Sequence, residues 1–226
     1  MQLSDRVALI SGGASGLGLA TAITLQSRGM RVAVFDCDQA KLDTASSKHG
    51  LMALNVDVTD SLAVEQACQQ VVASLGAVHV NVNCAGIAPA SRVVSRQGPQ
   101  PLSAFEQVIQ VNLVGTFNVL RVVAAQMMQQ SLHQEERGVI INTASVAAFD
   151  GQIGQAAYSA SKGGVVAMTL PIAREFAKMA IRVMAIAPGI MHTPMMAAMP
   201  ESVQAGLNAS VPFPARMGSA DEYANL

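Results

Sequence analysis

The segment YSASK, residues 158–162, places a phenol and an ammonium four positions apart among small residues. In a helix, side chains at positions i and i+4 lie on the same face about one turn apart, so Tyr158 and Lys162 would be neighbours. A cation close to a phenol stabilises the phenolate and so favours proton transfer by the tyrosine. The same spacing is also typical of an amphipathic surface pair without a chemical role. Other motifs of the chain are needed to distinguish these two interpretations.

A glycine-rich segment, SGGASGLG at residues 11–18, directly follows the apolar run RVALIS and precedes the helical pattern LATAITLQS. Gly12, Gly16 and Gly18 allow the backbone to turn sharply and to approach a pyrophosphate. The start of the helix offers free N–H groups and the positive end of its dipole. A strand, a glycine-rich loop and a helix in this order are typical of dinucleotide binding, although a tight turn without a ligand uses the same residues.

The second apolar run, RVAVFD, ends in Asp36, which follows Gly18 at nearly the spacing of an acidic residue that binds the adenosine ribose. A carboxylate accepts hydrogen bonds from a ribose 2'-hydroxyl but repels a 2'-phosphate. Asp36 therefore favours NAD over NADP as the cofactor.

Six apolar runs alternate with longer segments rich in Ala, Gln and Leu, at residues 6–11, 31–36, 51–58, 78–86, 138–145 and 181–189. This alternation predicts an α/β fold: a Rossmann-type, doubly wound parallel sheet with helices on both faces, in a single domain over residues 1–226. Ser145 ends the fifth run, at the carboxyl edge of the sheet where ligands bind in such folds. Residues 95–101 and 131–138 read as polar surface insertions.

Several motifs in this order resemble the short-chain dehydrogenase/reductases: SGGASGLG, NCAG (83–86), VNLVGTFN (111–118), Ser145, YSASK and APG (187–189). Within that family, GVIINTASVAAF, GQAAYSASKGG, MTLPIAR and VPFPAR are most similar to the short-chain 3-hydroxyacyl-CoA dehydrogenases, a group also classed among the hydroxysteroid dehydrogenases. The resemblance implies NAD-dependent oxidation of a secondary alcohol in fatty acid metabolism, from (S)-3-hydroxyacyl-CoA to 3-oxoacyl-CoA. The alternatives are a 3-oxoacyl-carrier-protein reductase or hydroxysteroid dehydrogenase on the same scaffold, and a catalytically weak NAD-binding scaffold protein.

The resemblance also implies roles for individual residues. Tyr158 would be the general acid/base and Lys162 its activator, Ser145 would hold the substrate oxygen, and Asn112 would kink a helix and support a water relay. The implied cofactor contacts are Gly12, Ser15, Gly16, Leu17, Gly18, Asp36, Asp57, Val58, Cys84, Gly86, Tyr158, Lys162, Pro188, Gly189 and Thr193. Ser15 stands where NADP-preferring relatives often carry a basic residue, which agrees with Asp36.

The proposed base requires a shifted pKa. An unperturbed tyrosine has a pKa of about 10, so a base near neutral pH needs a pKa lower by roughly 3 units, or about 4 kcal/mol. One ammonium at about 4 Å supplies an energy of that order where the effective dielectric constant is near 20. We therefore expect Lys162 to lower the pKa of Tyr158, with the positive charge of an oxidised nicotinamide adding to the effect.

The composition limits the classes of partner. Hydrophobic residues make up 51% of the 226 residues and charged residues 13%, which indicates extensive burial within the fold or between subunits, and the resemblance implies a homotetramer. A net charge of -1 without a Lys/Arg cluster gives little electrostatic reason to bind nucleic acid or an anionic membrane, and we expect no apolar stretch of the roughly 18 residues that a membrane span needs. Three cysteines without metal-ligand spacing predict no metal site and reduced thiols in the cytoplasm.

Residues 189–212 are predicted to form a lid over a small-molecule substrate. Met191, Met195, Met196 and Met199 offer a soft apolar surface for an acyl chain or a flat ring system, or else a helix face packed on the core. His192 is a candidate substrate contact. Relatives continue for about another helix and strand beyond ADEYANL, so we expect the last strand of the sheet to be missing and a sheet edge to be exposed.

Overall fold

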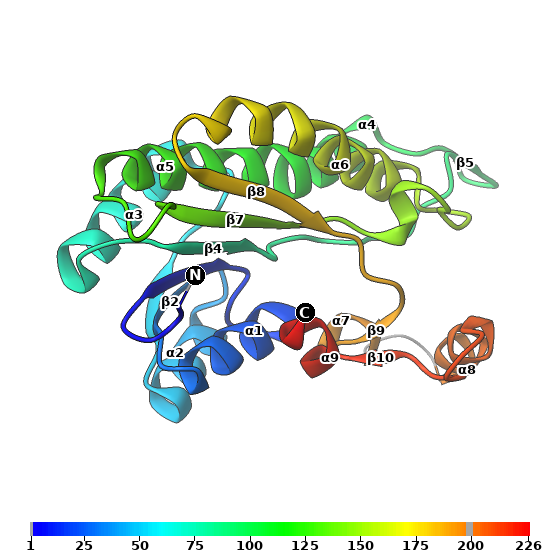
Figure 1. Ribbon diagram of the computed structural model, residues 1–226. Coiled ribbons are helices and arrows are strands. Elements are labelled where there is room, and N and C mark those ends of the chain that lie inside the picture. The colour runs from blue at the N-terminus through cyan, green and yellow to red at the C-terminus, as the bar shows by residue number, and fades with distance from the viewer. Residues whose placement is uncertain (1, 198–200) are drawn as a thin grey trace.

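Six parallel strands form one sheet in the order β3-β2-β1-β4-β7-β8 (Figure 1). The computed structural model describes residues 2–197 and 201–226. The strands are β1 (Val7–Ser11), β2 (Arg31–Asp36), β3 (Met52–Asn55), β4 (Val80–Asn83), β7 (Gly138–Thr143) and β8 (Ile181–Ile186). Successive strands are added on one side of β1 as far as β3 and then, starting with β4, on its other side. The direction in which strands are added to the sheet therefore reverses between β1 and β4.

Helices cover both faces of the sheet, which confirms the doubly wound architecture (Figure 1). The lower face in Figure 1 carries α1 (Gly16–Ser27), α2 (Gln39–His49) and α9 (Ala220–Asn225), and the upper face carries α3 (Ser61–Leu75), α4 (Leu102–Ile109), α5 (Gly115–Gln129) and α6 (Ala156–Ala177). Strand residues alternate between two buried clusters: Leu9 and Phe35 pack on the α3/α5 side, whereas Ile10 and Val34 pack on the side of α1 and α2. Both faces of the central strands are therefore apolar and buried.

Local signals set the helix boundaries that the sequence suggests. The Asp38 side chain accepts a hydrogen bond from the Lys41 N–H at the start of α2, and Asp60 accepts from Leu62 and Ala63 at the start of α3. Gly50 ends α2 in the left-handed conformation that glycine adopts most easily. These caps place the loops that leave the carboxyl ends of β2 and β3.

The predicted strands are correct in position but too long at their carboxyl ends. The run 51–58 is a strand only over Met52–Asn55, and the runs ending at residues 86, 145 and 189 leave the sheet at Asn83, Thr143 and Ile186. After β3 the chain turns at Asp57, whose carboxylate accepts hydrogen bonds from the Thr59 N–H and hydroxyl at 2.9 and 2.8 Å. The apolar residues beyond each strand end pack in loops rather than in the ladder.

Hydrogen-bonded asparagines interrupt the apolar core at the centre of the sheet. Asn83 donates to the side-chain oxygens of Asn81 and Asn142, both at 2.9 Å, and accepts from the Ser11 hydroxyl at 3.2 Å. These side chains belong to three adjacent strands, β1, β4 and β7. Because buried polar groups must find partners, the network favours one register of these strands and so one arrangement of the loops that follow them.

Helices α4 and α5 are joined by a π-helical turn, η1 (Gln110–Val114), into one long helix. By length and composition this helix, Leu102–Gln129, would be able to cross a membrane, with a hydropathy of 1.5 in its most apolar window. The expectation that no apolar stretch reaches this length does not hold for this helix, because polar residues scattered along it disguise its apolar composition. In the fold 56% of that window is buried, which is the arrangement of a core helix packed on a sheet.

Strand β8 forms one edge of the sheet and pairs only with β7 within the described residues, and the expectation of a missing last strand stays a prediction. Ile181 and Val183 point into the core, whereas Arg182 and Met184 are exposed. The predicted insertion at 95–101 forms an exposed hairpin of β5 (Val94–Ser95) and β6 (Gly98–Pro99). After β8 come β9 (Met191–His192), α7 (Pro194–Ala197), α8 (Glu201–Ser210) and β10 (Gly218–Ser219), with β9 and β10 paired in parallel.

Two leucines, one on α2 and one on α3 on the opposite face of the sheet, test which side chains form the core. Leu42 in α2 is 1% exposed and Leu62 in α3 is 62% exposed. We expect Leu42→Ala to lower the free energy of unfolding by about 2–5 kcal/mol, because it removes buried methyl groups and leaves a cavity. Leu62→Ala should change it by less than about 0.5 kcal/mol. Urea unfolding of both variants measures the difference, and equal effects would contradict the packing described above.

Candidate active site

A cavity of about 740 Å³ lies at the carboxyl edge of the sheet, beside the reversal between β1 and β4. This volume is within the range typical of small-molecule and cofactor sites. Most of the predicted cofactor contacts line it, namely Gly12, Ser15, Gly16, Leu17, Gly18, Asp36, Asp57, Val58, Cys84, Gly86 and Thr193. The structure thus brings together residues from the loops after β1, β2, β3 and β4 and from the segment after β8.

Sequence reasoning missed other residues that line the same cavity: Cys37, Asp38, Lys41, Val56, Ala85, Ile87, Gln107, Val111 and Pro194. Most of them are immediate neighbours of predicted residues in the same loops. Their place in these loops is the feature of the sequence that could have identified them. Gln107 and Val111 come from the long helix. Val111 adjoins the predicted residue Asn112 in the segment VNLVGTFN, whereas nothing in the local pattern distinguishes Gln107 from ordinary helix residues.

The glycine-rich loop meets the loop after β4 in backbone contact. Gly12 has a φ of +65°, and a Cβ atom at this position would lie 2.6 Å from the Ala85 nitrogen. A Cβ at Gly18 would lie within 2.2 Å of the Gly12 carbonyl oxygen. Only glycine fits at these two positions, and α1 therefore begins directly at the cavity wall, where its first N–H groups can meet an anion.

The carboxylate of Asp36 lies at the end of β2 in the cavity wall. One of its oxygens accepts a hydrogen bond from the Ala14 N–H and the other from the Asp38 N–H, both at 3.2 Å. Lys41 is the basic side chain in this part of the lining, and it is paired with Asp38 at 2.9 Å. The local charge at this end of the cavity is therefore negative.

Ser145, Tyr158 and Lys162 come together as the spacing predicts. Ser145 lies between β7 and the short 3-10 helix η2 (Val146–Ala148), where its side chain accepts a hydrogen bond from the Ala147 N–H at 3.1 Å and acts on the pKa of the Tyr158 phenol. The Nζ atom of Lys162 lies 5.8 Å from the centroid of the Tyr158 ring. A Cβ atom at the cavity-lining residue Gly86 would be 3.8 Å from the same Nζ. The three side chains thus form one cluster beside the cavity.

Lys162 does not act on the phenol as we expected. Burial raises the pKa of Tyr158, and the hydrogen bond with Ser145 lowers it by less. Lys162 is 4% exposed, and its ammonium donates a hydrogen bond to the Thr143 carbonyl at 2.6 Å. Its own pKa is lowered to about 8 by burial. The expected lowering of the Tyr158 pKa by Lys162 is therefore wrong, because burial has the largest effect on this phenol and raises its pKa.

Asn112 lies in the π-helical turn η1, in agreement with the predicted helix irregularity. Its side chain is fully buried and bonds the backbone of Ile87 in both directions, accepting from the N–H at 2.8 Å and donating to the carbonyl at 2.9 Å. It also donates to the Ser161 hydroxyl at 3.1 Å, on the helix that carries Tyr158. Asn112 thus fixes the loop after β4 against α6, and the predicted water relay stays a prediction.

Residues after β8 are only partly placed at the cavity. Thr193 lines it, whereas the Pro188 carbonyl accepts a hydrogen bond from the Val146 N–H at 3.0 Å, next to Ser145, and Gly189 follows it. His192 is exposed and lines a separate, smaller cavity with Arg216. Within the predicted lid, 189–212, residues 198–200 lie outside the described residues, and with them Met199, as does the side chain of Met195.

A buried cluster under the site was not predicted. The Tyr223 hydroxyl of α9 lies 2.7 Å from the Thr143 hydroxyl and 3.8 Å from the Cys84 sulfur. Burial raises the pKa of both Cys84 and Tyr223, so the Cys84 thiol is a packed group. All three cysteines are free, and no three His, Cys, Asp or Glu side chains in the described ranges group as metal ligands.

Comparisons with known proteins agree with this geometry. A family model described as short chain dehydrogenase matches residues 6–204. The 3-hydroxyacyl-CoA dehydrogenase type-2 of Homo sapiens is 50% identical over 225 residues, which cover 97% of this chain and 86% of the human protein. The 3-oxoacyl-(acyl-carrier-protein) reductase FabG of Thermotoga maritima is 35% identical, over 100% of this chain and 90% of that protein.

Among solved structures, the 3-hydroxyacyl-CoA dehydrogenase type-2 from Mycobacterium avium superposes with a TM-score of 0.91 at 38% identity, and covers 98% of this chain and 87% of that one. The shared sheet, the glycine-rich loop and the Ser-Tyr-Lys cluster are thus accompanied by similarity along nearly the whole chain. This chain belongs to the short-chain dehydrogenase family and is an oxidoreductase.

Proposed function

We propose that this enzyme oxidises (S)-3-hydroxyacyl-CoA to 3-oxoacyl-CoA with NAD. The observation that carries the proposal is the cluster of Ser145, Tyr158 and Lys162 beside a cavity that has a glycine-rich loop in its wall and an acidic residue at one end. The names of relatives at about half identity support the choice of substrate.

The cavity residues fit a dinucleotide. Gly12, Gly16 and Gly18 leave room for a pyrophosphate at the start of α1, and Asp36 offers acceptors to ribose hydroxyls. By resemblance we assign Asp57 and Val58 to the adenine, and Cys84 and Gly86 to the middle of the cofactor. Pro188, Gly189 and Thr193 are assigned to the nicotinamide end. When bound, NAD⁺ supplies a hydride acceptor and a positive charge beside the phenol.

Tyr158 acts as the base in this proposal. Ser145 donates a hydrogen bond to the substrate oxygen and holds the hydroxyl next to the phenol. Burial raises the pKa of Tyr158, so a positive charge close to the phenol would favour its deprotonation. Lys162, close behind Gly86, is then able to stabilise the phenolate. The proton of the substrate hydroxyl passes to Tyr158.

Replacement of Tyr158 by Phe tests the reaction. We expect Tyr158→Phe to lower kcat for (S)-3-hydroxybutyryl-CoA with NAD by roughly 10²- to 10⁴-fold, because the general base is lost. Its affinity for NADH, measured by fluorescence titration, should change little. Undiminished turnover by the variant would refute this role of Tyr158.

A companion assay separates the rival functions. A reductase of acyl-carrier-protein substrates, as the Thermotoga maritima relative is named, should prefer NADPH and an acyl-carrier-protein thioester over acetoacetyl-CoA. A hydroxysteroid dehydrogenase should prefer a steroid alcohol in the same assay. A scaffold protein should bind NAD without turnover of any of these substrates.

Lys162 should stabilise the Tyr158 phenolate during the reaction but lower the free energy of unfolding. Its folded-state pKa of about 8 lies below that of a free lysine, so the folded protein bears the cost of a buried charge below pH 8. This cost disappears as the pH rises from about 8 to 10.5, where stability should increase. We expect Lys162→Met to abolish activity. It should also raise the free energy of unfolding by about 1–3 kcal/mol at pH 7, a net value that includes the loss of the hydrogen bond to Thr143.

Urea unfolding at pH 7 and pH 9.5 measures this effect, and the advantage of the variant should shrink at the higher pH. The control is Lys178→Met, an exposed lysine just beyond α6, which should change stability by less than about 0.5 kcal/mol. A variant that is less stable than the wild type at pH 7 would contradict the burial argument.

Asp36 should determine the choice of cofactor. Asp36→Asn removes the negative charge but keeps an acceptor for the Ala14 N–H. We expect KM for NAD to rise about tenfold and the preference for NAD over NADP to fall, because charge-assisted bonds to the ribose are lost. Asp43→Asn, on α2 and outside the cavity lining, is the matched control. Equal cofactor preference in Asp36→Asn and the wild type would argue against NAD recognition by Asp36.

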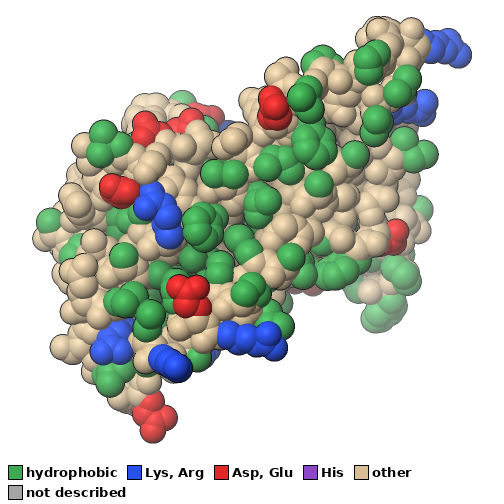
Figure 2. All heavy atoms as spheres, turned by 90° about the horizontal axis from the view of Figure 1, so that it is seen from above, with side chains coloured by type: hydrophobic (Ala, Val, Ile, Leu, Met, Phe, Trp, Pro, Cys, Tyr) green, Lys and Arg blue, Asp and Glu red, His purple; other side chains and the backbone are tan. Residues whose placement is uncertain are grey.

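We also propose a homotetramer in the cytoplasm. Val114, Phe117 and Met128 on the long helix and Leu170 on α6 are apolar and exposed. Figure 2 shows this side of the molecule from above, with hydrophobic side chains spread across the centre of the face. Helix faces of this kind suit contact with other copies of the chain. The three free thiols suit a reducing compartment.

A further inference from the structure

Asn118 is the last residue of the segment VNLVGTFN and has no part in the reaction described so far. It lies on α5, is 6% exposed, and donates from Nδ2 to the Val58 carbonyl at 2.8 Å. Val58 and Asp57 belong to the turn between β3 and α3 and line the cavity at the end assigned to the adenine. A side chain from the long helix therefore holds the backbone of the cavity wall.

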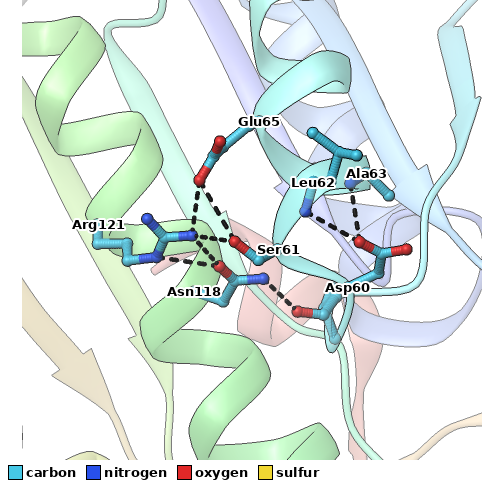
Figure 3. A network of polar contacts seen from close by, with 8 residues as sticks. Asp60, Ser61, Leu62, Ala63, Glu65, Asn118 and Arg121 are labelled. Atoms are coloured by element: carbon cyan, nitrogen blue, oxygen red, sulfur yellow. Dashed lines mark hydrogen bonds and ion pairs between the residues drawn. The ribbon is translucent and has the colours of Figure 1, made fainter.

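Arg121 fixes the orientation of the Asn118 amide (Figure 3). Its Nε and Nη2 atoms donate to the Asn118 Oδ1 at 3.1 and 2.8 Å, so the amide oxygen faces the guanidinium and the amide nitrogen faces Val58. A fork of two charge-assisted donors is a strong and directional partner for one oxygen. Nη2 also donates to the Ser61 hydroxyl at 2.7 Å and pairs with Glu65 at 3.0 Å, both on α3.

Close packing of α5 against the Val58 side chain accompanies the hydrogen bond from Asn118 to the Val58 carbonyl. A Cβ atom at Gly115, one turn before Asn118, would lie 2.5 Å from the Cγ2 atom of Val58. Helix α5 thus touches the Val58 side chain directly, while Asn118 bonds the Val58 carbonyl. Because Val58 is buried, loss of the donor would leave its carbonyl without a partner, and the turn would have to shift towards water.

We propose that Asn118, oriented by Arg121, is a positioning residue for the adenosine half of the cofactor. It holds the Asp57–Val58 turn in the conformation that receives the adenine. This inference rests on the proposed use of NAD. It differs from a general structural role because it predicts an effect on one half of the dinucleotide and none on the other.

The variant Asn118→Asp tests the inference, since it keeps the shape and the acceptor for Arg121 but removes the donor to Val58. We expect the Kd values for NAD and for ADP-ribose, measured by calorimetry, to rise about tenfold. The Kd for nicotinamide mononucleotide, which lacks the adenosine, should stay within about twofold. The kcat at saturating NAD and KM for the acyl-CoA should be unchanged.

Asn225→Asp is the matched control. Asn225 also accepts from an arginine, Arg28, at 3.1 Å, but it is exposed and lies outside the cavity lining. Its variant should leave the Kd values for all three ligands unchanged. If Asn118→Asp fails to fold, Arg121→Gln, at the more exposed end of the network, should weaken ADP-ribose binding selectively and by a smaller factor.

The outcomes separate this inference from the function on which it rests. Unchanged ADP-ribose binding in Asn118→Asp and Arg121→Gln would overturn the positioning role while NAD-dependent turnover by the wild type continued. Equal losses for ADP-ribose and nicotinamide mononucleotide would also overturn it, because they indicate a general loss of structure. A wild type that neither binds NAD nor turns over with it would instead refute the proposed function.

Discussion

A single buried charge constrains the whole site. The Lys162 ammonium is held inside the protein by the Thr143 carbonyl, so a strand end of β7 and a helix face of α6 must meet at a fixed separation. Burial of an ammonium opposes folding, and the apolar packing on both faces of the sheet has to offset it. The Asn83 network and the Asn112 bonds to Ile87 hold the neighbouring strand end in place. The fold around these strand ends therefore fixes where Lys162 lies relative to Tyr158.

Much of the fold and of the candidate site could be predicted from local sequence. The alternation of apolar runs indicates the sheet, and the glycine spacing with Asp36 indicates the cavity, because each signal lies within a strand, a loop and a helix that follow one another. The i, i+4 spacing of Tyr158 and Lys162 also holds in space. These features depend on periodicity and turn chemistry, which neighbouring residues determine.

Other features depend on contacts between distant residues, and the sequence contains no local sign of them. The bonds of Asn118 to Val58 and of Tyr223 to Thr143 join residues 60 and 80 positions apart. The predicted direction of the Tyr158 pKa shift is wrong. The sequence shows that a lysine lies near the tyrosine, whereas the desolvation of the phenol depends on how the fold packs around it. The strand ends were too long because apolar residues in loops look like strand residues until the ladder is known.

The π-helical turn at Gln110–Val114 has a consequence for the two ends of the cavity. One helix carries Asn112 towards the Tyr158 side and Asn118 towards the Asp57–Val58 side, and the wide turn lies between its two straight parts. An α-helical turn takes 3.6 residues, whereas a π-helical turn with its i→i+5 bonds takes about one residue more. The turn therefore takes up an extra residue locally and leaves the orientation of α5 nearly unchanged, so one helix contributes side chains to both ends of the cavity.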